Sequence, residues 1–225
     1  MLASFRPDLK ITFYFTLVII ASCFSDIHSQ RSKLSLRVEL LSEYLSRDSF
    51  SGFSESKHAL ALIDSLYIEA LRISESDKSE ALYTLMFTTI QYRMVPLRIP
   101  FTPFSLNYPL LSPSSHLFDK KNKNIPSFFL FDSKFTNSDD RDKLAHFFGS
   151  AYLSYNGLGF ISLLIGFYIE GFEDLFIENN SFDVRDLSIN ILGYHFGKQL
   201  QKEVSELPSS YIILHNLKHF LLKSG

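Results

Sequence analysis

Polar residues recur at helical spacing inside one of the most apolar parts of this chain, between residues 139 and 197. The stretch from Gly149 to Ile169 contains 21 residues without a charged side chain, and acidic residues flank it. Burying polar groups is costly unless they contact one another. The segment therefore predicts helices that pack around shared polar side chains, which form either a structural network or a functional site.

The same segment predicts three helices. The first begins at Asp139 or Asp140, because either side chain can cap a helix, and runs to about residue 155. Asparagine and glycine at 156–159 interrupt the pattern and separate this helix from a second one over 160–176. A third helix follows from about 181 to 203.

Each of the first two predicted helices gathers its polar residues on one side. On the first, Asp142 and His146 stand four residues apart and share a face, and Lys143 lies beside them. A carboxylate next to an imidazole raises the pKa of the ring and fixes its tautomer. The second helix ends in three acids that lie close together: Glu170, Glu173 and Asp174.

The third predicted helix has a continuous stripe of polar and small residues. Its members follow steps of three, four, three and four residues: Asp183, Asp186, Asn190, Gly193 and Gly197. The two glycines form a Gly-x-x-x-Gly pair, which lets another backbone approach closely. The stripe predicts that this helix packs against a neighbour at short distance.

Two interpretations of these residues remain open. If the helices meet, His146, Glu170 and Asp186 are candidate catalytic residues, since an imidazole with two carboxylates can bind a divalent metal or perform acid–base chemistry. The alternative is a structural hydrogen-bond network that includes Asp142, Lys143, Glu173, Asp174, Asp183 and Asn190. No tight ligand spacing is present, so no cofactor is expected, with a divalent metal as the alternative.

The rest of the chain favours an all-α helical bundle. Its 225 residues, 46% of them hydrophobic, can bury one substantial core with a small appendage. Apolar periodicity predicts a helical hairpin over 54–73 and 77–94, and a last helix over 209–222. His215 and His219 on that last helix have no acidic neighbour and are interpreted as surface residues. A net charge of −2 argues against nucleic-acid binding.

A proline-rich segment divides the chain. Six of the eight prolines lie at 96–138, and proline removes a backbone donor and restricts the residue before it. We expect no long helix there, but an irregular loop packed on the core, with an exposed tip at 119–123. This loop separates an N-terminal helical region at 24–95 from a C-terminal helical domain at 139–225.

The first 23 residues have the pattern of a lipoprotein signal segment. Two basic residues precede a short apolar run over 11–20, which is too short for a comfortable membrane span. Small residues then lead to Cys23, the only cysteine of the chain, so a disulfide framework is excluded. The pattern predicts lipidation of Cys23 and a membrane-bound location in a bacterial envelope, with ordinary signal cleavage or an uncleaved anchor as the alternatives.

The ordered motif of residues 139–198 resembles the VanZ-like superfamily, and its YfiM-type putative lipoproteins in particular. The residues that carry the resemblance are Asp142, Lys143, His146 and Phe147, then Glu170, and then Asp186, Asn190, Gly193 and Gly197. The resemblance implies a small helical membrane protein, because VanZ-like proteins are of that kind and some are linked to glycopeptide resistance.

The sequence thus predicts a lipid-anchored envelope lipoprotein with a binding or structural role. The membrane lipid reached through Cys23 is the expected partner, and a protein partner cannot be named. One alternative is a membrane-surface hydrolase that uses His146, Glu170 and Asp186. Another is a membrane-spanning VanZ-like protein, since the uncharged stretch at 149–169 is long enough to cross a bilayer.

Overall fold

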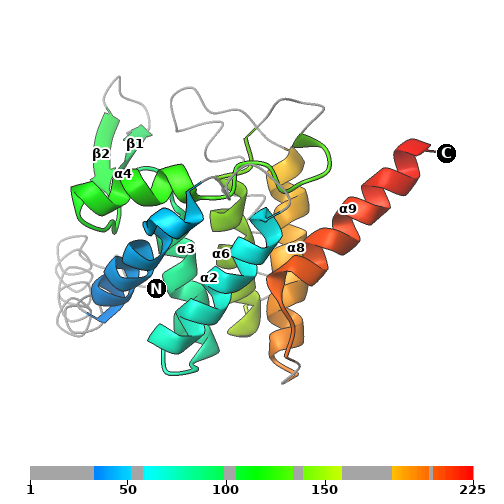
Figure 1. The fold of residues 1–225 in the computed structure, drawn as a ribbon, viewed down its shortest axis with the longest axis horizontal. Helices are drawn as coiled ribbons and strands as arrows, with labels where there is room; N and C mark the ends of the chain where they lie inside the picture. The colour runs from blue at the N-terminus through cyan, green and yellow to red at the C-terminus, as the bar shows by residue number, and fades with distance from the viewer. Residues whose placement is uncertain are drawn as a thin grey trace, which may run out of the picture.

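The computed structural model describes residues 33–51, 58–98, 105–133, 139–158, 184–202 and 205–224. These residues are mostly helical, which confirms the all-α class (Figure 1). A helix over residues 33–45 comes first, and a short 3-10 turn, η1 (Asp48–Phe50), follows it. The other helices are α2 (Ala59–Ile73), α3 (Lys78–Thr89), α4 (Ser115–Asn124), α6 (Lys143–Tyr155), α8 (Val184–Leu200) and α9 (Pro208–Ser224).

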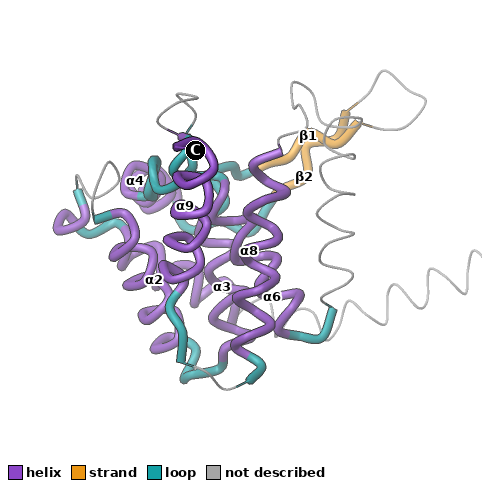
Figure 2. The backbone as a smooth tube through the Cα atoms, turned by 90° about the vertical axis from the view of Figure 1, so that its right-hand side faces the viewer, coloured by secondary structure: helices purple, strands orange, loops and turns teal. Residues whose placement is uncertain are grey.

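The core lies between helices that pack in a closed series. Helix α6 contacts both α3 and α8, α2 contacts α3 and α9, and α9 contacts α8 (Figures 1 and 2). Aromatic rings fill the centre: Phe196 of α8 stacks on Phe147 of α6 at a centroid distance of 5.5 Å and meets the edge of Tyr67 of α2 at 5.3 Å. Such contacts contribute beyond area burial alone, so residues distant in sequence hold α2, α6 and α8 together.

Helices α2 and α3 form the expected hairpin, although α3 ends at Thr89 and not at residue 94, where β1 begins. Glu75 and Ser76 have φ angles of 53° and 69° and reverse the chain direction between the helices. Asp77 caps α3, and its side chain accepts a hydrogen bond of 3.0 Å from the amide of Glu80. This cap satisfies one of the amides that a helix N-terminus leaves free.

The proline-rich segment differs from the expected irregular loop. Strands β1 (Met94–Arg98) and β2 (Ser105–Pro109) pair in antiparallel register, with Met94 opposite Pro109. Both strands are edge strands of a two-stranded sheet, where a missing amide donor is tolerated. Helix α4 then begins two residues after Pro113. The prolines therefore limit the length of the elements here without abolishing them.

The prediction of an exposed tip at 119–123 was wrong at its centre. Lys121 lies on α4 with no exposed surface. Its ammonium nitrogen donates to the carbonyl of Ile90 at 2.7 Å, and it lies 4.7 Å from the centroid of the Phe118 ring. The aliphatic stem of lysine can cover apolar surface, so a basic residue can lie on the inner face of an amphipathic helix.

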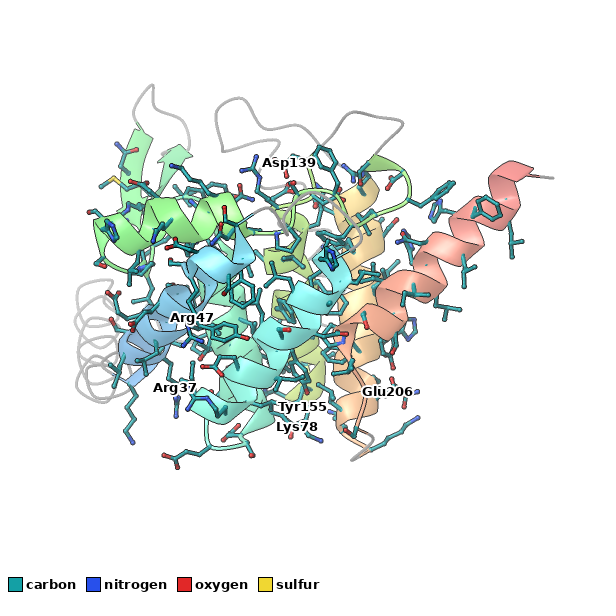
Figure 3. All side chains as sticks on the ribbon, viewed as in Figure 1. Arg37, Arg47, Lys78, Asp139, Tyr155 and Glu206 are labelled. Carbon is teal, nitrogen blue, oxygen red and sulfur yellow. The ribbon has the colours of Figure 1, made fainter. Side chains whose placement is uncertain are left out.

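The predicted start of the next helix was also wrong. Helix α6 begins at Lys143, and the side chain of the N-cap residue Asp142 makes no capping hydrogen bond. Asp139 instead binds the side chain of Arg141 at the top of the fold in Figure 3. The helix ends at Tyr155, as expected, and Asn156 and Gly157 follow it. The φ angle of Gly157 is 81°, a backbone conformation that favours glycine.

None of the helices in the described ranges combines the length and the apolar character needed to cross a membrane. The residues at 159–183 lie outside those ranges. The predicted second helix at 160–176, and any span over 149–169, therefore stay predictions.

Candidate functional site

The structure brings four of the predicted polar residues together where α6 meets α8. The ammonium of Lys143 lies 2.7 Å from the Oδ1 atom of Asp186 and 3.0 Å from the Oδ2 atom of Asp142. The Nε2 atom of His146 lies 3.8 Å from the same Asp186 oxygen. Lys143 and His146 lie on adjacent turns of α6, and Asp186 of α8 faces this part of α6.

These groups are enclosed by protein. The side chains of Lys143 and Asp186 are 3% and 8% exposed, and that of His146 is 17% exposed. Among the described residues no donor points at Asp186 Oδ1 with good hydrogen-bond alignment. We describe its contact with Lys143 as an ion pair, because Coulomb attraction depends on the separation of the charges and not on hydrogen alignment.

The environment of Asp186 destabilises the charged form of its carboxyl group relative to water. Burial raises the pKa of Asp186, and the nearby His146 and Lys143 oppose that rise without cancelling it. A buried ion pair of this kind stabilises a fold only weakly, because desolvation offsets the attraction, but removing one partner leaves the other charge uncompensated. The arrangement is consistent with a structural contact between α6 and α8 and also with an acid–base role for Asp186.

Below this cluster, polar and small residues continue along the α6–α8 interface. The hydroxyl of Ser150 donates to the amide oxygen of Asn190 at 2.9 Å, and that of Ser154 donates to the carbonyl of Tyr194 at 2.9 Å. A Cβ atom placed on Gly193 would lie 2.1 Å from the Phe147 carbonyl oxygen. The two helices therefore contact each other backbone to backbone, as the Gly-x-x-x-Gly pair predicts.

Gly197 repeats this contact one turn further along. A Cβ atom there would lie 2.2 Å from the carbonyl oxygen of Ala151. Figures 1 and 2 both show α6 and α8 side by side along most of their length. The interface leaves no room for a larger side chain at either glycine.

A second polar cluster, around Asp140, was not predicted. The Asp140 side chain is completely buried and accepts hydrogen bonds from the backbone amides of Phe129 at 2.8 Å and Leu130 at 2.9 Å. It also binds the guanidinium of Arg185 and the hydroxyl of Ser133. The second acidic partner of Arg185 is Asp132, at 3.1 Å.

The other candidate residues lie outside the described ranges. These are Glu170, Glu173, Asp174 and Asp183, together with Cys23. Within the residues that the structure describes, no group of three or more His, Cys, Asp or Glu side chains could hold a metal ion. Of the predicted cluster of His146, Glu170 and Asp186, the structure therefore places only His146 and Asp186.

Two surface hollows lie away from this cluster. One, of about 700 Å³, is lined by Leu34, by Tyr83 and Phe87 of α3, and by residues 108–111. The other, of about 860 Å³, lies between α8 and α9. Neither is lined by Lys143, His146 or Asp186.

The fold and this interface define a helical protein with a polar, closely packed helix pair. No family model matches the chain, and neither the curated proteins nor the solved structures compared with it give a match. The VanZ-like resemblance of residues 139–198 therefore stays a prediction based on those residues alone.

Proposed function

We propose that this chain is a lipid-anchored bacterial envelope protein with a structural or binding role. In this proposal the polar residues between α6 and α8 join the two helices and perform no catalysis. The supporting observation is the closeness of the interface, where Gly193 and Gly197 bring two backbones together next to the Lys143–Asp186 ion pair.

One observation favours a second candidate, a membrane-surface hydrolase. His146 and Asp186 lie 3.8 Å apart, and burial raises the pKa of Asp186. A carboxyl group with a raised pKa next to an imidazole is a plausible acid–base pair. Glu170 would be the third group of such a site.

Metal content and stability of a His146→Ala variant distinguish the two candidates. For a structural role we expect purified protein without stoichiometric metal and a loss of about 1 kcal/mol in unfolding free energy, because one buried polar contact is removed. His116→Ala on α4 is the control for histidine loss elsewhere. Stoichiometric zinc or manganese in the parent protein that disappears in His146→Ala would support the hydrolase instead.

Membrane fractionation of a Cys23→Ala variant tests the lipid anchor. We expect the parent protein in the membrane fraction, and the variant in the carbonate wash, because two or more acyl chains hold a protein stably on a bilayer. Ser22→Ala is the matched control, since it keeps a small residue before the cysteine. A variant that resists carbonate extraction would contradict the anchor and favour a spanning protein.

A further inference from the structure

Helix α9 exposes an apolar stripe that runs from its middle to its C-terminal end. Leu214 and Leu221 are 67% and 66% exposed, and Ile213, Leu217 and Phe220 are also exposed. Their spacing of three, four and seven residues places them on one side of a helix. Contiguous apolar surface of this kind marks an interaction site more often than an isolated exposed leucine does.

The inner half of α9 is fixed to the rest of the fold. Ile212 is fully buried, and the Ser209 amide donates to the Asp64 carboxylate of α2 at 2.9 Å. Asn216 exchanges hydrogen bonds with the backbone of Phe129 and Phe131, both at 2.8 Å. Beyond these contacts the ribbon of α9 extends away from the other helices (Figures 1 and 3). The helix therefore holds the stripe in a defined orientation.

The polar residues that line the hollow beside the stripe are basic or neutral. The hollow between α8 and α9 is lined by aliphatic residues, one serine, and basic residues: Lys218, His195, His215 and His219. No carboxylate is among its lining residues. The sequence from 208 to 225 contains Lys218 and Lys223 and no acidic residue. The net positive charge of this helix contrasts with the net charge of −2 of the whole chain.

His215 contributes apolar surface more than charge. Burial, together with its neighbour His219, lowers the pKa of His215 to about 4, so the ring is neutral near pH 7. The two imidazole rings lie 4.4 Å apart between their centroids. His215 therefore belongs to the less polar border of the helix, and Lys218 and Lys223 carry its formal positive charge.

We propose that the outer half of α9 docks onto the surface of an anionic phospholipid bilayer. Its apolar stripe would enter the boundary between headgroups and acyl chains, with Lys218 directed to lipid phosphates. An exposed apolar face combined with lysines and no acids is the pattern of interfacial helices. A second copy of the chain is a poorer occupant, because a two-fold contact would bring the same positive charges together. The inference rests on the proposed function for placing the protein at a membrane.

A fluorescent label at Leu221 tests the docking directly. In the full chain with Cys23→Ser, Leu221→Cys is labelled with an environment-sensitive dye and mixed with phosphatidylcholine vesicles, with and without phosphatidylglycerol. We expect a blue shift with the anionic vesicles that weakens as salt is raised. Met94→Cys on β1, which is 57% exposed, is the matched position and should show no shift.

Charge reversal provides the second measurement. Lys218→Glu keeps the apolar stripe, and it should weaken binding to the anionic vesicles about tenfold or more, because two charge units change near the surface. Lys120→Glu on α4 should leave that binding unchanged. An unchanged spectrum at position 221 on anionic vesicles, or equal shifts on neutral ones, overturns the proposal. A shift that grows with protein concentration in the absence of vesicles overturns it in favour of a second copy.

The lipid anchor at Cys23 and the docking of α9 are tested independently of each other. Every protein in this test lacks Cys23, so loss of the lipid anchor does not change the signal at position 221. Conversely, the fractionation of Cys23→Ala reports on the anchor whether or not α9 enters the bilayer.

Discussion

At the scale of single residues, the carboxylate of Asp140 joins three parts of the fold. It accepts hydrogen bonds from the backbone amides of Phe129 and Leu130, and it binds Arg185 at the start of α8. A buried carboxylate that accepts several hydrogen bonds and pairs with a guanidinium cannot be replaced by a neutral amide without losing some of these contacts. Asp139, its neighbour in sequence, binds only the exposed side chain and amide of Arg141 among the contacts described for it.

We predict losses of very different size for the two adjacent acids. Asp140→Asn should lower the unfolding free energy by about 3 kcal/mol, because Arg185 loses a buried charge partner. Asp139→Asn should lower it by less than about 1 kcal/mol, as expected for a partly exposed pair. Urea unfolding of both variants measures the difference, and similar losses would show that Asp140 does not hold the segments together.

A second prediction concerns the buried amine of Lys121. Burial, with help from Arg93, lowers the pKa of Lys121 from 10.5 to about 7. Between these two values the unfolded chain binds a proton that the folded protein does not, so stability rises with pH across this window and the full cost of a buried charge is present below about pH 7. We expect unfolding free energy to increase by about 1–2 kcal/mol from pH 7 to 9 on this account.

The matched pair for this pH dependence is Lys121→Met and Lys120→Met. Lys121→Met removes the titrating group and should flatten the rise. The side chain of Lys120 is 45% exposed, so Lys120→Met should follow the parent protein. Parallel pH curves for all three proteins would contradict the assignment to Lys121.

At the scale of elements, the α6–α8 pair depends on the two glycines of α8. Gly149 on α6 is a useful contrast, because a Cβ atom there would meet only the flexible Met86 side chain, at 3.2 Å. A Cβ atom at position 193 would instead overlap a backbone carbonyl group. A small movement of the Met86 side chain can relieve the contact at position 149. No side-chain movement can relieve the contact at position 193.

We therefore predict that Gly193→Ala is destabilising by about 3 kcal/mol or more, as expected for overpacking against backbone. Gly149→Ala should change stability by less than about 1 kcal/mol, since the higher helix propensity of alanine offsets the tighter contact with Met86. Thermal unfolding of both variants provides the measurement. Equal stability of the two would mean that α8 can move away from α6 without loss.

Sequence patterns predicted elements better than they predicted partners. The hairpin of α2 and α3, the break after Tyr155 and the contact of Lys143 with an acid all follow from periodicity, turn residues and charge spacing. The burial of Lys121 and the hydrogen bonds of Asp140 depend on segments far away in the chain. Local propensity cannot report such tertiary contacts, and a lysine or an aspartate looks like a surface or capping residue without them.

The proline-rich segment shows the same limit from the other direction. Proline excluded a long helix over 96–138, but it did not exclude a helix of ten residues or a two-stranded ribbon between the prolines. Edge strands and first turns of helices tolerate proline. A breaker residue therefore bounds the length of elements and says little about their presence.

At the scale of the whole molecule, packing is uneven. Helices α3, α6 and α8 share the core, whereas the outer half of α9 lies beyond it (Figure 1). Segments with few buried apolar contacts open more often than the core does. We expect slow amide hydrogen exchange along the facing sides of α6 and α8, and fast exchange over residues 217–222. Uniform protection along α9 in the absence of lipid would contradict this prediction.

The absent side chains of Gly193 and Gly197 also restrict how this protein can diverge. In a population of variants selected only for a folded product, these two positions should resist change, while the exterior of the same helix drifts freely. The distance between the axes of α6 and α8 would then be inherited almost unaltered, even between descendants whose surfaces have nothing left in common.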